Sequence, residues 1–402
     1  MRASAFPGTA IDPSMIRVLL ISDFTESFSH KLLAGIVDYS RRKEQWIVRR
    51  MPPEYKAKIG IPGVIRVAKD WDIDAVIGQF EPTDDIGLFA ENGLIAIAQD
   101  FKKRFATIPN ITTDYIGTGR MAARFFLERG FRNFGFFGFN DVCWSDERCE
   151  GFRREVEAAG FGGSFYAYRM QEIAMVWHYQ RNRLSEWLRM IPKPIAIMAC
   201  DDNQGSNLIE ACHGLGIKIP SEVSVIGVDN DESLCSLGSV TLTSVQIDIE
   251  EGGRQTAALV ERLVADPSAP AEDVVLKPVK IVSRMSTAAF ATDDQQILKA
   301  ILFIHRNALK KISVADVMAE AALSRRLLER RFKSVTGKTL YEYITDQKLR
   351  YFAEQLEETD EQVINIALSM GENDTKSISR RFKQLYGCTP VEWRENKRKK
   401  QS

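Results

Sequence analysis

The 402-residue sequence predicts an α/β domain followed by an all-helical domain. Three observations predict this order. Short apolar runs alternate with amphipathic helical stretches through the first two thirds of the chain, a fifty-residue repeat lies near the C-terminus, and the net charge changes sign between the two parts. A chain of this length exceeds one ordinary hydrophobic core, so two or three domains are expected.

The N-terminal part begins with the apolar run Ile16–Ser22, which is followed by a helical pattern over His30–Arg42. Buried runs that alternate with amphipathic helices are typical of βαβ units and parallel sheets. Further strands are predicted at Trp46–Arg49, Ala75–Gly78, Leu94–Ala98, Phe134–Gly138, Ala196–Cys200, Val223–Val228 and Lys277–Ser283, and further helices at Pro62–Lys69, Ile116–Arg129, Arg148–Ala159, Trp177–Met190 and Asp202–Leu215.

Carboxylates follow several of the predicted strands. Open α/β sheets bind ligands beyond the carboxyl ends of their strands, so these side chains are candidates for a binding site. An Asp after a strand is also commonly a helix cap, and this alternative applies to each of them taken singly. The candidates are Asp23, with Phe24 beside it, and Asp201, Asp202 and Asp229.

Arg148 and Trp144 lie after the predicted strand Phe134–Gly138, and Arg148 is expected to open a helix. Carboxylates, an arginine and an aromatic ring suit a polyhydroxylated ligand, because charged groups bind hydroxyls and a ring covers the apolar face of a sugar. Taken alone, Arg148 is equally consistent with a surface charge and Trp144 with the core. Their joint placement favours a sugar site.

A repeat with a period of fifty residues lies in the C-terminal part. Arg330-Arg331-Phe332-Lys333 recurs as Arg380-Arg381-Phe382-Lys383, and the agreement continues from Gly337 to Gly387. The repeat predicts two copies of one helix-turn-helix unit. The first consists of Val314–Ala321 and Arg325–Val335 with Ser324 as N-cap, and the second of Gln362–Met370 and Thr375–Tyr386 with Gly371 at the turn and Asp374 as N-cap.

The second helix of each unit has an apolar face and a charged face. Leu328 and Phe332, like Ile378 and Phe382, fall four residues apart and are predicted core residues. The opposite faces carry side chains that suit base edges and phosphates of duplex DNA. A merely solvated face is the alternative. The candidates for DNA contact are Arg325, Arg326, Glu329 and Arg330 in the first copy and Thr375, Lys376, Ser379 and Arg380 in the second.

The distribution of charge supports a nucleic-acid partner. Phe290–Ser402 contains 21 Lys and Arg against 16 Asp and Glu, a net charge of +5, and the rest of the chain has −5.

A helical pattern over Lys338–Leu356 connects the two units and spans ~28 Å, close to the ~34 Å between successive major-groove faces. We expect a linker at 288–294, a DNA-binding domain at 295–396 and a basic tail at 397–402, where Lys397–Lys400 either contact phosphates or are solvated.

Several function classes receive no support. The six cysteines form no C-x-x-C pair, so reduced thiols in a cytoplasmic protein are expected, without a metal or cofactor. Met1–Met15 have no signal-peptide pattern, and no apolar run is long enough for a membrane span. Ile21-Ser22-Asp23-Phe24 has no glycine for a dinucleotide site, so an enzyme is not expected. A sugar-binding transport protein would need a secretory signal and no basic repeat.

The segments Ile111–Gly138, Arg148–Gly160, Ile197–Asn230 and Leu242–Leu263 resemble LacI-type sensor domains. The resemblance implies a two-lobed α/β domain of the type I periplasmic-binding-protein-like fold over 16–287. Lobe 1 would hold about 16–130 and 243–273 and lobe 2 about 131–242 and 274–287, with crossovers near Gly130, Leu242 and Val274. It also implies ligand contacts for Asp114, Arg148 and Asp229, with Asp201 at a position where the family has Asn. The roughly fifteen residues ahead of the first strand are too few for that family's DNA-binding headpiece.

The segment from Ile366-Ala367 through Phe382-Lys383 to Thr389-Pro390 and Trp393-Arg394 resembles the AraC family, with Glu372 and Ile378 in place of usual aromatics. The two resemblances together imply an all-α double helix-turn-helix domain behind a sugar sensor. They imply a cytoplasmic, nucleoid-associated homodimer that binds an operator, contacts RNA polymerase and activates pentose catabolism. D-xylose is the first expected effector, and another sugar or small metabolite is the alternative.

Overall fold

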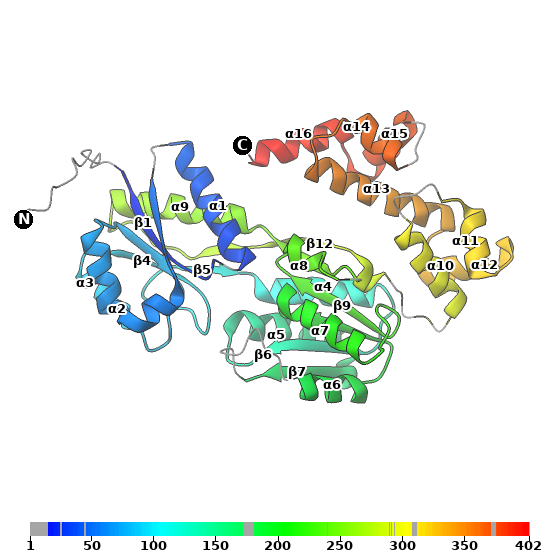
Figure 1. The fold of residues 1–402 in the computed structure, drawn as a ribbon, viewed down its shortest axis with the longest axis horizontal. Coiled ribbons are helices and arrows are strands. Elements are labelled where there is room, and N and C mark those ends of the chain that lie inside the picture. The colour runs from blue at the N-terminus through cyan, green and yellow to red at the C-terminus, as the bar shows by residue number, and fades with distance from the viewer. Residues whose placement is uncertain are drawn as a thin grey trace, which may run out of the picture.

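The computed structural model describes residues 15–401 except 25, 44–45, 172–180, 239, 289, 291, 293, 308–311 and 371–374. Figure 1 shows two α/β lobes next to each other and an elongated helical unit that carries the C-terminus. Each lobe is built on one six-stranded sheet. The predicted order, an α/β domain followed by an all-helical domain, is confirmed.

The sheet of lobe 1 is entirely parallel. In spatial order its strands are β11 (Val274–Leu276), β5 (Asn110–Thr113), β4 (Ile95–Gln99), β3 (Ala75–Gly78), β1 (Arg17–Ile21) and β2 (Ile47–Met51). Helices α1 (Ser27–Arg41) and α9 (Ile249–Ala265) cover one face, and α2 (Pro53–Asp70) and α3 (Gly87–Glu91) cover the other. Along β1, Val18 and Leu20 face the first layer and Leu19 and Ile21 the second, so the strand is apolar throughout.

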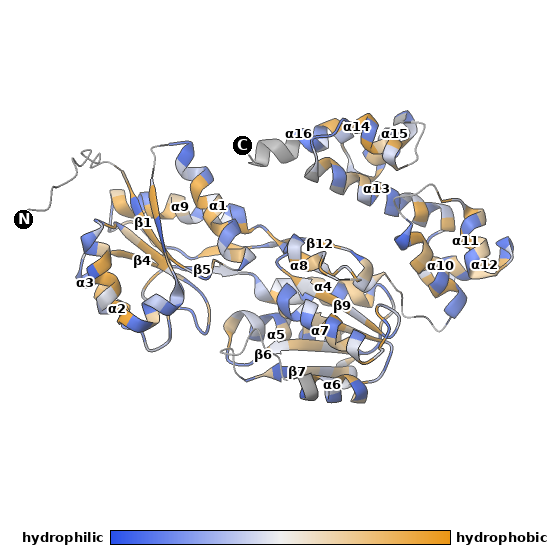
Figure 2. Ribbon diagram, in the orientation of Figure 1, coloured by the Kyte–Doolittle hydropathy of each residue, from blue (hydrophilic) through white to orange (hydrophobic). Residues whose placement is uncertain are grey.

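The sheet of lobe 2 is parallel except for β12, which runs antiparallel to β10. In spatial order its strands are β12 (Pro278–Val282), β10 (Thr243–Ile247), β9 (Val223–Val228), β8 (Ile195–Ala199), β6 (Phe134–Phe139) and β7 (Phe165–Met170). One face packs on α4 (Tyr115–Leu127) and α5 (Cys143–Ala158), and the other on α6 (Arg181–Met190) and α7 (Asp202–Gly214). The short helices are α8 (Glu232–Cys235), η1 (Gly162–Ser164) and η3 (Met285–Thr287). Figure 2 shows the central strands of both sheets as strongly apolar segments.

Three connections join the lobes, and they correct the predicted crossovers near Gly130, Leu242 and Val274. The chain passes between lobes at Asp114, at Asp248 and at Lys277. The first crossover comes earlier than predicted because α4 already packs on α5 in lobe 2. The second comes later because β10 still pairs with β9 in lobe 2, and the chain enters lobe 1 only with α9, which packs on α1. Residues 115–130 and 243–247 therefore belong to lobe 2, and β11 belongs to lobe 1.

Some elements differ from the sequence-based prediction. β7 was not predicted, because it is an edge strand whose residues are only half-buried and show no clear apolar alternation. α5 begins at Cys143, so Arg148 lies in its second turn and does not open it. α2 begins at Pro53 and bends at Gly60, where a φ of 63° lets the chain turn two residues before Pro62. The predicted helix Trp177–Met190 lies outside the described residues over 177–180.

The C-terminal domain contains the two predicted helix-turn-helix units. Its helices are α10 (Gln295–Arg306), α11 (Val314–Ala321), α12 (Arg325–Thr336), α13 (Leu340–Glu358), α14 (Val363–Ser369), α15 (Thr375–Tyr386) and α16 (Pro390–Gln401). The units are α11–α12 and α14–α15, and the predicted turn residues Gly371 and Asp374 of the second lie outside the described residues. α16 continues through Gln401, so residues 397–401 extend a helix where a separate tail was predicted.

Each helix-turn-helix unit has its own hydrophobic core. Phe332 is fully buried in the first and Phe382 in the second, as the repeat predicts. α13 joins the units because its N-terminal half packs in the first core through Leu340 and its C-terminal half in the second through Phe352. Thr339 precedes α13 and forms a capping box with Glu342. The Thr339 hydroxyl oxygen accepts from the Glu342 N–H, and the Glu342 carboxylate accepts from the Thr339 N–H. Ser324 precedes α12 without a side-chain cap.

Helices α4 and α5 approach each other so closely that side chains would not fit between them. A Cβ on Gly119 would lie 2.1 Å from the carbonyl oxygen of Arg148, and one on Gly151 would lie 2.2 Å from that of Ile116. Both clashes are with backbone, which cannot move without separating the helices. The two glycines therefore set the position of Arg148 relative to α4.

We expect Gly119→Ala to destabilise lobe 2 by about 1–3 kcal/mol, because the added methyl must push α5 away from α4. Thermal unfolding of the full-length chain should show a melting temperature lowered by several degrees. Gly163→Ala is the matched control, since its Cβ would meet no atom within 4 Å. Equal melting temperatures for the two variants would contradict this packing.

Candidate functional site

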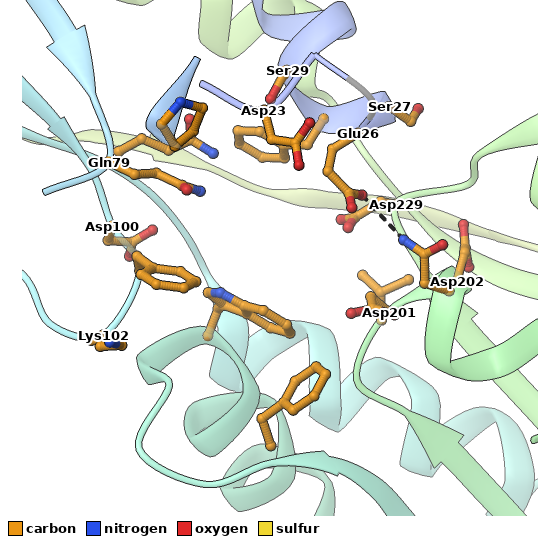
Figure 3. A pocket seen from close by; sticks show the side chains of 18 of the residues that line it. Asp23, Glu26, Ser27, Ser29, Gln79, Asp100, Lys102, Asp201, Asp202 and Asp229 are labelled. Carbon is orange, nitrogen blue, oxygen red and sulfur yellow. Dashed lines mark hydrogen bonds between the residues drawn. The ribbon is translucent and has the colours of Figure 1, made fainter. Parts of the chain in front are cut away.

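A pocket of about 610 Å³ lies between the lobes, at the carboxyl ends of the strands. Lobe 1 contributes the loop after β1 with Asp23 and Glu26, and lobe 2 contributes residues after β8 and β9, including Asp201 and Asp229. Figure 3 shows these carboxylates gathered on one side of the cavity. Parallel strands of both sheets end at this edge, which is where the α/β architecture places a ligand.

Arg148 is a buried cation of the pocket, with only 4% of the residue exposed. Its Nη1 donates to the carbonyl oxygen of Cys200 at 2.5 Å, and its Nη2 donates to Oδ1 of Asp229 at 3.3 Å. The guanidinium also lies over the rings of Tyr115 and Trp144, 5.1 and 5.4 Å from their centres. Burial alone would lower the pKa of Arg148, but nearby negative charge, chiefly Asp229, raises it above the ordinary value. The arginine is held charged and oriented.

Glu26 is a half-buried carboxylate that faces other carboxylates. Burial, together with the negative charges of Asp201, Asp23 and Asp229, raises its pKa to about 7. Asn203 opposes the shift because its Nδ2 donates to Glu26 Oε2 at 3.1 Å. This bond connects the loop after β1 to α7 and therefore crosses between the lobes.

Asp201 and Asp202 have different structural roles. Asp201 caps α7 by accepting from the Gln204 N–H at 2.7 Å, and burial raises its pKa to about 6. Asp202 points into lobe 2, where it accepts from Ser244 Oγ at 2.6 Å and from the Asp231 N–H at 2.7 Å. Burial raises the pKa of Asp202 to about 8. Asp202 therefore also holds together the loop that carries Asp229.

The loop after β9 has an unusual backbone. Asp229 and Asn230 have φ values of 94° and 48°, in the left-handed region that non-glycine residues rarely adopt. Lys31 of α1 donates from Nζ to the carbonyl oxygens of both residues at 2.8 Å. This conformation turns the Asp229 side chain toward Arg148, and backbone strain of this kind clusters at functional sites.

Further bonds join the lobes at the opposite side of the pocket. Arg104 makes a two-pronged ion pair with Glu147 of α5, with both N–O distances at 2.8 Å. The Tyr115 hydroxyl, at the start of α4, donates to Asp100 Oδ1 at 2.7 Å. Tyr115 thus contacts lobe 1 through its hydroxyl and Arg148 through its ring.

Six of the eight sequence-predicted ligand residues line the pocket, and two do not. Phe24 lies outside the lining, where its ring meets His30 and Arg50. Asp114 also lies outside it, because its carboxylate caps α4 by accepting from the Gly117 N–H at 2.7 Å. The residues that line the pocket are Asp23, Trp144, Arg148, Asp201, Asp202 and Asp229.

Other lining residues were missed by the sequence analysis. Glu26 is three residues beyond Asp23 in the same loop, and Asn203 follows the predicted pair Asp201-Asp202. The sequence analysis considered the residues that directly follow each predicted strand. Including the next three residues of each loop would have found both Glu26 and Asn203. No such signal existed for Tyr115. It begins helix α4, which the sequence analysis had assigned to lobe 1 and which belongs to lobe 2.

The outer faces of α12 and α15 carry most of the predicted DNA-contacting residues at the surface. Arg325, Arg326 and Arg330 are exposed, as are Lys376 and Arg380, while Ser379 is half-buried. Glu329 is half-buried and turns toward the start of α13, where its carboxylate accepts from the Leu340 N–H at 3.4 Å. Thr375 begins α15, but its side chain lies outside the described residues.

The linker meets both domains at Phe290. Arg129 follows the last turn of α4, and its guanidinium lies 3.4 Å from the centre of the Phe125 ring and 5.9 Å from that of Phe290. The Phe290 ring lies 6.3 Å from that of Tyr343 in α13. Burial and the neighbouring charge of Arg350 lower the pKa of Arg129 to about 10. Phe290 therefore lies between Arg129 of lobe 2 and Tyr343 of the C-terminal domain.

Comparison with known proteins agrees with this two-part organisation. A periplasmic binding protein-like domain is matched over residues 123–287 and a helix-turn-helix domain over residues 317–396. The xylose operon regulatory protein of Escherichia coli K12 is 26% identical over 391 residues, which span 94% of this chain and 97% of that protein. Its Haemophilus influenzae Rd namesake is 28% identical over 332 residues, or 81% and 85%.

A solved structure of the xylose-binding transcription activator xylR has the same fold, with a TM-score of 0.63 at 24% identity. The match covers 95% of this chain and 98% of that one. Within the part of the chain that the structure describes, no helix is both long and apolar enough to cross a membrane.

We expect the stability of the sensor to fall as the pH rises from about 4 to about 8. The pKa of Asp202 rises from an ordinary 3.8 to about 8 on folding, so the folded state binds a proton that the unfolded state lacks in this window. Asp202→Asn should flatten the fall, because the amide mimics the protonated carboxyl. Urea unfolding at pH 5, 6, 7 and 8 measures how the free energy of unfolding depends on pH, and Asp85→Asn at an exposed position is the control. If the free energy of unfolding of Asp202→Asn fell with pH as steeply as that of the parent, Asp202 would not hold a proton in the folded state.

Proposed function

Because this chain is an AraC-family regulator whose helix-turn-helix domain follows a periplasmic-binding-protein-like sensor, we propose that a sugar bound between the lobes changes how it binds operator DNA. The observation that carries the proposal is the pairing, within one chain, of a pocket built around buried Arg148 with two exposed basic helix faces. A regulator of this kind needs no catalytic step.

The chemistry of the pocket supports a polyhydroxylated ligand. Arg148 supplies donors to ring or hydroxyl oxygens, and the carboxylates supply acceptors for hydroxyl protons. The rings of Trp144 and Phe28 line the same cavity and suit the apolar C–H face of a sugar. D-xylose is the first sugar to test, because the relatives named above are xylose regulators, and activation of a pentose operon is the corresponding output.

The basic faces support recognition of duplex DNA. Arg325, Arg326 and Arg330 project from α12 and Lys376 and Arg380 from α15, which suits guanine edges and phosphates. The 19-residue helix α13 is ~28 Å long and packs in one unit through its N-terminal half and in the other through its C-terminal half, a length that suits neighbouring turns of the major groove. We further propose a cytoplasmic homodimer on the operator that contacts RNA polymerase. Light scattering that finds one chain per operator would contradict the dimer.

The response travels through α4 in this proposal. Its first residue, Tyr115, contacts Arg148 in the pocket, and Arg129, just after its end, contacts the linker residue Phe290. A ligand that repositions Arg148 would move Tyr115, and a rigid helix transmits this displacement to the linker. The Phe290 ring in turn packs against Tyr343 at the core of the first helix-turn-helix unit.

Separate variants should remove the two binding activities. Arg148→Ala or Asp229→Ala should weaken binding of the effector sugar ten- to hundredfold, the cost of a lost charged hydrogen bond, with DNA affinity unchanged. Arg326→Ala or Lys376→Ala should weaken operator binding and, for a phosphate contact, flatten the salt slope by ~1. Calorimetry with a sugar panel and band shifts at fixed salt measure both. Each variant is the control for the other, and one that alters both affinities would contradict the assignment.

Phe290→Ala should uncouple sensing from DNA binding. Both affinities should stay close to those of the parent, while the change in operator affinity on adding sugar, typically 5–150-fold for coupled sites, should fall toward one. Phe303→Ala removes the same ring volume from the first helix-turn-helix core without touching Arg129 and serves as control. A full response in Phe290→Ala would remove the proposed route.

A further inference from the structure

The loop after β9, residues 229–231, is bonded to three parts of the molecule. The side chain of Asp229 lines the pocket and pairs with Arg148. The backbone carbonyl oxygens of the loop accept from lobe 1, and the side chain of Asn230 accepts from the segment that leads to the linker. The loop therefore joins the pocket, the opposite lobe and the exit of the chain from the sensor.

Lys31 provides the bonds from lobe 1. It lies in α1, and its Nζ donates to the carbonyl oxygens of Asp229 and Asn230, both at 2.8 Å. The lysine is half-buried and lies outside the pocket lining. Two-lobed α/β binding proteins respond to ligands by closing at their hinge. Lys31 can thus respond to closure of the lobes without contacting a ligand.

The backbone of the loop makes these bonds specific to one conformation. Asp229 and Asn230 have φ values of 94° and 48°, and two consecutive residues in the left-handed region are strained unless something supports them. In this conformation both carbonyl oxygens lie against the same ammonium group. Charged hydrogen bonds are the stronger ones. When the lobes move apart, α1 withdraws Lys31, and the loop loses that support.

Asn230 connects the loop to Arg284. Its Oδ1 accepts from Arg284 Nη2 at 2.9 Å, and its N–H donates to Ser244 Oγ at 3.0 Å. The other nitrogen, Arg284 Nη1, donates to the Leu242 carbonyl oxygen at 2.9 Å. Arg284 directly precedes η3, after which the linker begins. The direction of the Asn230 side chain therefore acts on the residue from which the chain leaves the sensor.

We propose that Lys31 is a positioning residue for the sugar response. It holds the loop in its left-handed conformation while the lobes are closed, and Asn230 passes this state through Arg284 to the linker. The inference rests on the proposed sugar-sensing function and adds a residue outside both proposed binding surfaces. Its contacts are separate from those of Arg129 and Phe290, so it is a second route beside the one through α4.

Hydrogen–deuterium exchange on the full-length chain, with and without saturating D-xylose, tests the connection. The N–H groups of Arg284, Ser286 and Ala288 are all hydrogen-bonded, so their exchange reports opening of this segment. Lys31→Met should raise their exchange rates at least about threefold in one of the two states, part of the effect of a lost charged hydrogen bond. Lys31→Arg should restore them because it keeps the cation. Parent rates in Lys31→Met in both states would overturn the inference.

Lys43→Met is the matched control. Lys43 follows the end of α1, and its Nζ pairs with Glu261 of α9 at 2.7 Å, so this ion pair stays within lobe 1. The variant removes a lysine from the same lobe without changing a contact to lobe 2, and the exchange of residues 284–288 should match that of the parent. Lys31→Gln repeats the test if Lys31→Met folds poorly.

The sugar response should separate the two steps of the route. Calorimetry with D-xylose and band shifts at one fixed salt measure sugar affinity and the change in operator affinity. Lys31→Met should weaken sugar binding about tenfold, because closure loses a charged hydrogen bond, and should reduce the response at saturation. Asn230→Gly should keep the sugar affinity of the parent and bring the response toward one, since glycine removes the amide and tolerates the positive φ. Asn230→Asp should restore the response.

The outcomes distinguish this inference from the proposed function. A full response in Lys31→Met or in Asn230→Gly would overturn the inference and leave sugar sensing intact. A loss in Lys31→Met that Lys31→Arg does not restore would also overturn it, because the side chain would then act by packing. If the parent binds no sugar, the proposed function fails, and the exchange rates in the absence of sugar still decide whether Lys31 controls the segment before the linker.

Discussion

Burying the guanidinium of Arg148 is the constraint on which the site depends. A cation at 4% exposure must be compensated by charge and by hydrogen-bond acceptors, and the nearest ones come from the ends of β8 and β9. These strands are neighbours in the sheet, so Cys200 and Asp229 reach the arginine together. The close approach of α4 and α5 places Tyr115 over the same group. One buried charge thus organises the pocket wall in lobe 2.

The acidic character of the pocket follows from how the carboxylates are used. Asp202 is bonded within lobe 2 and Asp201 caps a helix, yet both side chains remain in the lining. Structural roles and ligand contact are therefore not exclusive at strand ends. The cap keeps a carboxylate fixed at the cavity. Burial, and after it the neighbouring negative charges, raises the pKa of Glu26 and of Asp201.

Much of the fold could be predicted because buried strands such as β1 and β9 are continuous apolar runs, and because a fifty-residue repeat cannot arise without a repeated unit. The lobe boundaries could not. A strand such as β10 has the same apolar pattern in either sheet, and only its partner β9 assigns it to lobe 2. At the site, Asp114 and Asp201 look alike in sequence, but both cap helices and only Asp201 reaches the cavity. Glu329 turned out to contact the start of α13, a tertiary contact that helical periodicity cannot reveal.

The order in which the two lobes share the chain has a consequence for synthesis and for evolution. Helix α9 and edge strand β11 of lobe 1 are translated only after β10 of lobe 2, so neither lobe is complete until residues near 280 have left the ribosome. The three-connection sensor can therefore complete its two sheets only after this segment is available, and exchanging one lobe by recombination would need several simultaneous junctions. The DNA reader is a single uninterrupted stretch, which one junction after residue 287 can attach or replace. New pairings of sensor and operator arise most easily at that single point.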